Sequence, residues 1–105
     1  DLINLGDIRM TMYVQIDNDE VVINEEKLGD VVVWAKSLNE TKDMLTLLRR
    51  NQAYYLRIPN EKNEYFKNFN IHPSNTDGYL EGKLEQDEAQ KLIDIGISID
   101  ETPSN

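Results

Sequence analysis

The order of apolar and polar residues predicts a β-hairpin near the beginning of the chain. Residues 10–17 alternate between apolar and polar positions in their later part, and they contain tyrosine and valine, which favour strands. Asn18 and Asp19 tolerate the positive φ angles of a two-residue turn. Residues 21–23 are apolar and are expected to return beside the first segment as the second strand.

Two helices are expected after this hairpin. Asn24 is suited to cap the first helix. The apolar residues that follow at helical spacing are Leu28, Val31, Val32, Ala35 and Leu38. Gly29 and the β-branched run 31–33 lower helix propensity, so a strand over residues 31–34 is the alternative. A second helix is predicted over residues 40–51, because acidic residues lie at its start and arginines at its end, as the helix dipole favours.

A second hairpin is predicted from two segments in the middle of the chain. Residues 53–58 have the composition of a strand, which Pro59 would end. Residues 64–71 place aromatic and apolar side chains at a period of two, as a strand does. The polar residues 60–63 are expected to form the turn between these two strands.

The last third of the chain predicts a loop, a strand, a helix and a final short strand. Residues 72–78 have the composition of a loop, and residues 79–84 suit a short strand. Asp87 begins a pattern similar to a capping box, and Gly96 suits the end of the helix that would follow. Residues 97–99 are expected to run back as a strand.

These elements do not alternate as β-α-β units, so they predict an α+β fold rather than a doubly wound α/β fold. A length of 105 residues predicts a small single domain over residues 1–105. We expect two hairpins in a mixed or antiparallel sheet and two to three helices. Residues 1–9 are expected to be a leftover tag or a flexible extension, and residues 101–105 a flexible tail.

The composition excludes several classes of protein. The chain has no cysteine, which excludes disulfide scaffolds, zinc ribbons and cysteine nucleophiles. His72 is the only histidine, so a two-histidine metal site is excluded, and His72 itself is expected in a loop. The longest apolar run, residues 31–35, is too short to span a membrane. No signal-peptide pattern is visible, so a cytoplasmic location is expected.

The common catalytic motifs are missing from the sequence. A calcium-binding EF-hand starting at Asp17 would need glycine at its sixth position and a carboxylate at its twelfth, where the chain has Val22 and Leu28. No Gly-x-Ser-x-Gly motif accompanies His72, and there is no glycine-rich phosphate loop. With 20 acidic residues, chance pairs of carboxylates are expected, so no acid–base pair stands out. We therefore expect no catalytic residues, no metal and no cofactor.

Acidic residues are concentrated in two segments. The chain has a net charge of −9. Residues 17–30 contain six acidic residues and one basic residue, and residues 77–101 contain eight acidic and two basic residues, whereas residues 36–76 contain seven basic and four acidic residues. If the fold brings acidic side chains together, their potential attracts basic protein surfaces. The expected partner-binding residues are Asp17, Asp19, Glu20, Glu25, Glu26, Asp30, Glu81, Glu85, Asp87 and Glu88.

The central segment offers an alternative binding patch, because it mixes aromatic and basic residues as proteins that bind single-stranded nucleic acid do. The residues of this patch are Tyr54, Tyr55, Arg57, Tyr65 and Lys67. Aromatic residues at a period of two more often belong to a core, and the negative net charge opposes binding to phosphates. Nucleic acid is therefore disfavoured as a partner.

These features predict a small, acidic, non-catalytic protein-binding module. In its sharper form it is an inhibitor or immunity-type protein whose carboxylates imitate phosphate groups on a basic partner. Eleven asparagines and ten isoleucines suit an AT-rich coding sequence of phage or bacterial origin. The alternatives are a structural subunit of a larger phage or bacterial assembly and a small binder of single-stranded nucleic acid.

Overall fold

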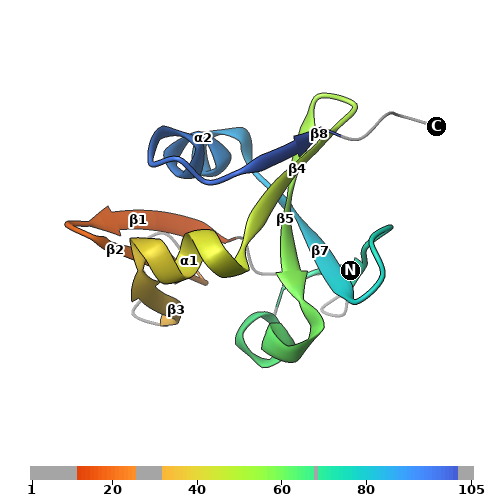
Figure 1. The fold of residues 1–105 in the computed structure, drawn as a ribbon, viewed down its shortest axis with the longest axis horizontal. Helices are drawn as coiled ribbons and strands as arrows, with labels where there is room; N and C mark the ends of the chain where they lie inside the picture. Colours follow the sequence, from red (N-terminus) through yellow and green to blue (C-terminus); the bar gives the residue numbers. More distant parts are fainter. Residues whose placement is uncertain (1–11, 26–31, 68, 102–105) are drawn as a thin grey trace, which may run out of the picture.

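The chain folds into an α+β arrangement of two sheets, as the sequence predicts. The computed structural model describes residues 12–25, 32–67 and 69–101, which form eight strands and three helices (Figure 1). The first sheet contains β1 (Tyr13–Asp17), β2 (Glu20–Asn24) and β3 (Val32–Ser37), in that order. The second sheet has the order β6 (Ile71–Pro73), β7 (Tyr79–Leu84), β5 (Ala53–Pro59), β4 (Thr46–Arg50) and β8 (Ile99–Glu101). The helices are α1 (Leu38–Met44), the 3-10 helix η2 (Asn60–Phe66) and α2 (Gln86–Asp94).

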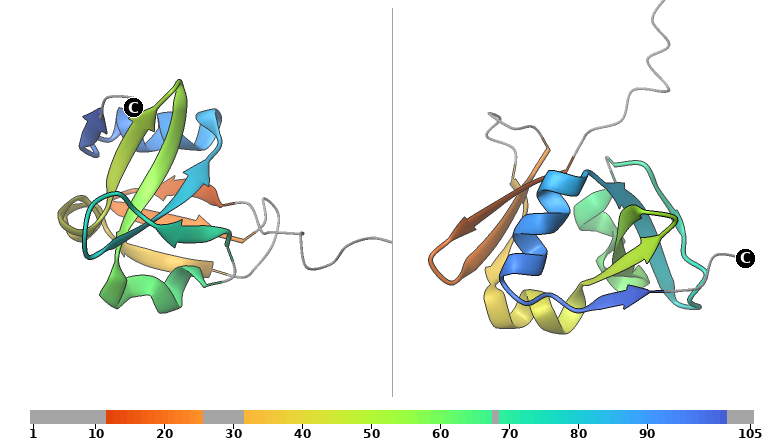
Figure 2. Two further views of the ribbon diagram at one scale, coloured as in Figure 1. Left: turned by 90° about the vertical axis from the view of Figure 1, so that its right-hand side faces the viewer. Right: turned by 90° about the horizontal axis from the view of Figure 1, so that it is seen from above.

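The core lies between the inner faces of the two sheets. Helix α2 contacts both β1 and β5, and η2 contacts both β3 and β5. Seen from above, α2 lies between β1 and the five-stranded sheet (Figure 2). The largest buried apolar side chains include Ile23, Trp34, Leu47, Leu56, Ile58, Phe66 and Leu92. One face of each sheet is thereby buried, and the opposite face of the five-stranded sheet carries the polar network described below.

The predicted first hairpin is confirmed. Strands β1 and β2 pair antiparallel, with Asp17 opposite Glu20 and Asn18 and Asp19 between them. Asn18 has a φ of 55°, which asparagine tolerates better than most residues. Alternation also places Val14, Val21 and Ile23 in the core. Because the strands and their turn are adjacent in sequence, this hairpin could be predicted from local pattern alone.

The helix predicted from Asn24 onward is wrong for residues 32–37, while residues 26–31 lie outside the described part of the chain. Residues 32–37 form β3 instead, with Trp34 opposite Ile23. The β-branched residues that made the helix doubtful suit the extended backbone. The alternative prediction, a strand over residues 31–34, is therefore correct for residues 32–34, which the structure describes.

The second predicted helix is correct only in its first half. Helix α1 begins earlier than expected, because the Ser37 hydroxyl accepts a hydrogen bond from the Glu40 amide at 3.1 Å and caps it. The helix ends at Met44, and residues 46–50 form β4. Strand β4 pairs with β5 on one side and with β8 on the other, so its backbone hydrogen bonds come from distant segments. This tertiary pairing overrides the helical spacing of its leucines.

The second predicted hairpin is wrong, although its first strand is present. Strand β5 pairs with β4 and β7, and the turn that leads into it is Asn51-Gln52, where both residues have positive φ. Residues 60–66 form η2 rather than a turn and a strand. The buried rings of Phe66 and Phe69 fill the core from this helix and the segment after it. Phe66 and Phe69, which belong to the segment whose spacing of two predicted a strand, are therefore core residues of a helix and the segment after it.

The predicted strand over residues 79–84 is confirmed as β7. The expected loop is shorter than predicted, because residues 71–73 form β6 and His72 lies in that strand. Helix α2 begins after Glu85 rather than at Asp87, and Gly96 follows its end with a φ of 95°. Strand β8 covers residues 99–101 instead of 97–99, and residues 102–105 lie outside the described part.

Helix α2 lies alongside β1 and protects the outer edge of this strand. The Val14 amide donates to the Glu88 carboxylate at 2.7 Å, and the Lys91 ammonium donates to the Val14 carbonyl at 2.9 Å. These side chains replace the hydrogen bonds of a neighbouring strand, so the edge at Val14 is not offered to other chains. Within the described residues, no helix is long and apolar enough to cross a membrane.

We predict that Glu88→Ala lowers the free energy of unfolding by about 2 kcal/mol, because it leaves the buried Val14 amide without an acceptor. Urea denaturation followed by circular dichroism measures this loss. Asp87→Ala is the matched control, since Asp87 is exposed on the same helix and should change stability by less than about 0.5 kcal/mol. Equal losses in the two variants would contradict the edge-protecting role of Glu88.

Candidate functional site

An acidic end is formed where the β1–β2 turn meets the beginning of α1. Glu20 lies opposite Ser37, and the Asp19 carbonyl accepts a hydrogen bond from the Leu38 amide at 2.6 Å. These contacts fix the turn against the helix. Asp19, Ser37, Leu38 and Asn39 line a shallow hollow between them. We call Asp17, Asp19 and Glu20, together with this rim, the acidic end.

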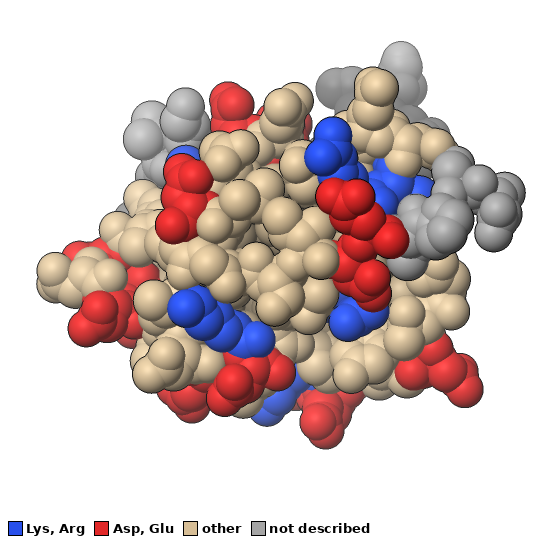
Figure 3. Space-filling view, turned by 45° about the horizontal axis from the view of Figure 1, so that its top comes forward, with Lys and Arg blue, Asp and Glu red and all other residues tan. Residues whose placement is uncertain are grey.

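The carboxylates of the acidic end are exposed and are not neutralised. Asp17, Asp19 and Glu20 form no ion pair with any residue that the structure describes. Acidic atoms are visible on the left-hand projection in Figure 3, which is the end formed by the β1–β2 turn. In contrast, four other carboxylates are paired with lysine or arginine: Glu81, Glu88, Asp100 and Glu101. The unbalanced negative charge of the hairpin is therefore concentrated at its tip.

The other predicted partner-binding residues do not join this surface. Glu25 is 9% exposed, and Glu26 and Asp30 lie outside the described residues. Glu85 and Asp87 are exposed at the start of α2, which lies near the start of β1, whereas the helix ends toward the β1–β2 turn (Figures 1 and 2). The acidic segments thus form separate surfaces rather than one.

Glu81 and Glu88 are buried and serve the fold. Glu88 caps the edge of β1, as described above. Glu81 is 2% exposed and lies on the outer face of the five-stranded sheet. Because both carboxylates are engaged by neighbouring side chains, neither offers a charge to a partner, and we do not include them in the acidic end.

The Glu81 carboxylate is the centre of a polar network that joins three strands. Arg50 on β4 donates to both of its oxygens, at 2.8 and 2.9 Å. His72 on β6 lies 3.0 Å from Oε2, and the Ser74 hydroxyl donates to Oε1 at 3.1 Å. The hydrogen bonds from Arg50, aided by Ser74 and His72, outweigh the effect of burial and lower the pKa of Glu81 below its usual value. The same pairing raises the pKa of Arg50.

This network does not have the geometry of a serine hydrolase. Ser74 and His72 both bond to the Glu81 carboxylate, so the histidine does not stand between the hydroxyl and the acid. A nucleophilic serine needs a base to take its proton, and a carboxylate with a lowered pKa is a poor base. The arrangement holds strands and the segment after β6 together instead.

Stacked arginines extend the network across the same face of the sheet. The Arg50 guanidinium lies 4.8 Å from the Tyr55 ring centroid, and that of Arg57 lies 4.9 Å from Tyr79. Arg57 also pairs with Asp100 on β8 at 3.2 Å. Each arginine is thus fixed by a ring and a carboxylate, which leaves its side chain little freedom.

The structure divides the predicted aromatic and basic patch among three places. Tyr55 and Arg57 lie on the outer face of β5, whereas Tyr54 alternates to the opposite face. Tyr65 packs edge-to-face against Trp34 at 5.2 Å, in η2, and Lys67 follows that helix. These residues therefore do not form one platform for stacked bases.

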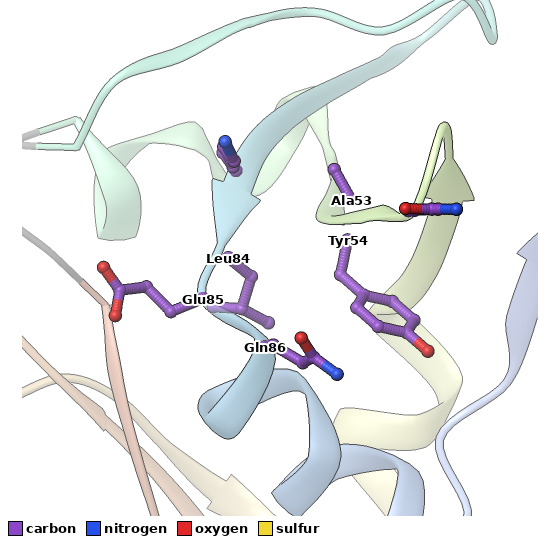
Figure 4. Close-up of a pocket in the computed structure, with 7 residues that line it drawn as sticks. Ala53, Tyr54, Leu84, Glu85 and Gln86 are labelled. Carbon is purple, nitrogen blue, oxygen red and sulfur yellow. The ribbon is translucent and has the colours of Figure 1, made fainter.

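A hollow of about 320 Å³ lies beside Tyr54 (Figure 4). It is bounded by the β4–β5 turn, the end of β7 and the first residue of α2. The Tyr54 ring and the Gln86 side chain face the hollow, whereas Glu85 points away from it (Figure 4). Gln52, Ala53, Lys83 and Leu84 complete the lining of the hollow.

Within the described residues, no group of three or more histidine, aspartate or glutamate side chains is placed to hold a metal ion. No protein-family model matches the chain. No curated protein and no solved structure matches it either.

Sequence reasoning missed Arg50, His72 and Ser74 as members of one network. The period of two in Tyr79, Glu81 and Lys83 was the available signal that Glu81 shares a strand face with polar neighbours. Which arginine would meet it depends on the order of the strands, and the sequence does not show that order.

Proposed function

We propose that this chain is a non-catalytic protein-binding module whose acidic end docks on a basic surface of another protein. The observation that carries the proposal is the grouping of three exposed carboxylates at one turn. Asp17, Asp19 and Glu20 are exposed and form no ion pair with a described residue, and a turn and a helix start hold them together. Such a surface increases the rate of association with a cationic partner.

The sharper form of the proposal is an inhibitor or immunity-type protein of phage or bacterial origin that acts in the cytoplasm. Its carboxylates would take the place of phosphate groups on a nucleic-acid-binding surface. The rigid attachment of the turn supports this form, because preorganised charges lose little entropy on binding. A structural subunit of a phage or bacterial assembly is the second candidate, supported by the open sheet face discussed in the next subsection.

Affinity capture from a bacterial lysate tests the proposal. The tagged chain and its variant Asp19→Lys/Glu20→Lys are used as baits, and bound proteins are eluted in salt steps and identified by mass spectrometry. We expect the wild-type bait to capture a basic protein that moderate salt releases, because exposed ion pairs are screened. The reversed bait should lose that protein, since its charges now repel the same surface.

The matched control reverses two exposed acids on η2, in the variant Glu61→Lys/Glu64→Lys. This bait has the same net charge as the reversed bait but keeps the acidic end. A captured protein that both reversed baits lose equally depends on net charge alone, and that result would contradict docking through the acidic end.

A further inference from the structure

The outer face of the five-stranded sheet has no helix packed on it among the described residues. Both α2 and η2 contact the other sheet as well as β5, so they lie on the core side. Cross-strand pairing places one histidine and five charged side chains on the outer face: Arg50, Arg57, His72, Glu81, Lys83 and Asp100. The side chain of His72 is 52% exposed, that of Asp100 is 48% exposed, and Lys83 is exposed as well. His72, Lys83 and Asp100 are therefore accessible to a partner, whereas Glu81 and Leu48 on the same face are buried.

The outer face is positive in an otherwise acidic protein. Its three lysine and arginine side chains and two carboxylates leave it at a net charge of +1, whereas the whole chain carries −9. Lys83 has no ion pair with a described residue. Lys83 lies opposite Tyr55, beside the Arg50 stack. A carboxylate-bearing surface is the charge complement of this face.

The composition and rigidity of the face suit a protein interface. Tyrosine and arginine are enriched among residues that dominate binding energy, and this face presents Tyr55 and Tyr79 with their stacked arginines. The ring contacts and ion pairs already fix these side chains, so little conformational entropy is lost when a partner covers them.

We propose that this face binds the acidic end of a second copy of the chain, in a head-to-tail arrangement. The chain itself carries the complementary group, because Asp17, Asp19 and Glu20 project from the tip of a hairpin and have no cation of their own. Nucleic acid fits the face less well, since guanidinium groups already lie against the Tyr55 and Tyr79 rings on which bases would stack. The inference shares the acidic end with the proposed function but also requires the sheet face.

An interface between two different surfaces does not close as a two-fold dimer. Each copy keeps one free acidic end or one free sheet face, so further copies add until a ring closes or a chain extends. The average mass should therefore rise steadily with concentration and should not level off at the mass of a dimer.

Sedimentation velocity tests this inference with the purified protein. At about 0.1 M salt the Debye length is about 10 Å, so the net repulsion between copies is screened while close charge pairs persist. We expect the weight-average sedimentation coefficient of the wild type to rise with concentration. Lys83→Glu reverses one charge on the face and should lower the association constant by about tenfold, because attraction becomes repulsion. Lys67→Glu, the same change at the end of η2, should leave association unchanged.

A mixture of two variants identifies the contacting surfaces. Lys83→Glu keeps the acidic end, and Asp19→Lys/Glu20→Lys keeps the sheet face. Each variant alone should associate more weakly than the wild type, whereas the mixture should recover association, because one partner supplies each intact surface. This recovery would support head-to-tail docking, and it does not depend on any other protein.

Three results would overturn the inference. The first is a wild type that stays monomeric at all concentrations, and the second is association that Lys83→Glu leaves unchanged. The third is binding of single-stranded oligonucleotides that Lys83→Glu abolishes, which would assign the face to nucleic acid. A chain that stays monomeric but still captures a basic protein through its acidic end would leave the proposed function intact.

Discussion

Glu81→Ala is expected to lower the free energy of unfolding by about 3 kcal/mol, because it leaves the partly buried Arg50 guanidinium without its counter-charge. His72 and Ser74 lose a hydrogen-bond partner in the same step. Urea denaturation at neutral pH measures the loss. The matched control is Glu85→Ala, which removes an exposed acid directly after β7, the strand that carries Glu81. This variant should change stability by less than about 0.5 kcal/mol.

A double-mutant cycle separates the ion pair from packing. Arg50→Met/Glu81→Leu replaces both charges with apolar side chains of similar size, which proteins often tolerate. We expect the double variant to lose less stability than the single variants Arg50→Met and Glu81→Leu lose together, because no charge is left unpaired. A double variant that is as unstable as the sum of the single variants would show that Arg50 and Glu81 do not act as a pair.

The stability that Glu81 contributes should depend on pH in one direction. The pKa of Glu81 is lower in the folded protein than in the unfolded chain, so the folded state binds the proton less tightly. The contribution is therefore fully present above the unfolded pKa of about 4.3 and is lost as the pH falls through the folded value. The stability difference between wild type and Glu81→Gln should shrink in acid and stay constant from neutral pH upward, as denaturation at a series of pH values will show.

Trp34→Ala is expected to lower the free energy of unfolding by about 4 kcal/mol, because it empties the centre of the core. Trp34 is 1% exposed, and its ring centroid lies 5.7 Å from that of Phe66 and 5.2 Å from that of Tyr65. Its indole nitrogen also donates to the Thr41 hydroxyl at 3.0 Å, which links β3 to α1. Urea denaturation followed by circular dichroism measures the loss, because the variant has no tryptophan whose fluorescence could report unfolding.

Two further variants separate packing from the hydrogen bond. Trp34→Phe keeps an aromatic ring in the core and should lose less than Trp34→Ala. Thr41→Val removes the acceptor but keeps the shape, and it should cost about 1–3 kcal/mol because the buried indole donor is left unsatisfied. Wild-type stability in Trp34→Ala would contradict the position of this ring in the core.

Local sequence pattern was sufficient where contacts are local. The β1–β2 hairpin is closed by a two-residue turn, and the alternation of its strands is visible without knowledge of the rest of the chain. Strand β7 and the end of α2 at Gly96 were predicted for similar reasons. The carboxylates of the acidic end were also identified from sequence, because they are adjacent in it.

Local pattern failed where backbone hydrogen bonds come from distant segments. Residues 46–50 have helical apolar spacing, yet they form β4 because β5 and β8 both pair with them. Residues 32–37 form β3 against β2 although Asn24 offered a helix cap. Residues 46–50 bury Leu47 and Leu48, whereas residues 32–37 bury only Trp34, and local spacing alone could not decide between helix and strand in either segment.

The sequence by itself determined the α+β class, the excess of acidic side chains and the hairpin that carries Asp17, Asp19 and Glu20. Only the tertiary structure decided which carboxylates remain available. Glu81 is neutralised by Arg50, 31 residues away, and Glu88 binds the Val14 amide, 74 residues away. Charge can be read from composition, but its neutralisation depends on which side chains the fold brings within hydrogen-bonding distance.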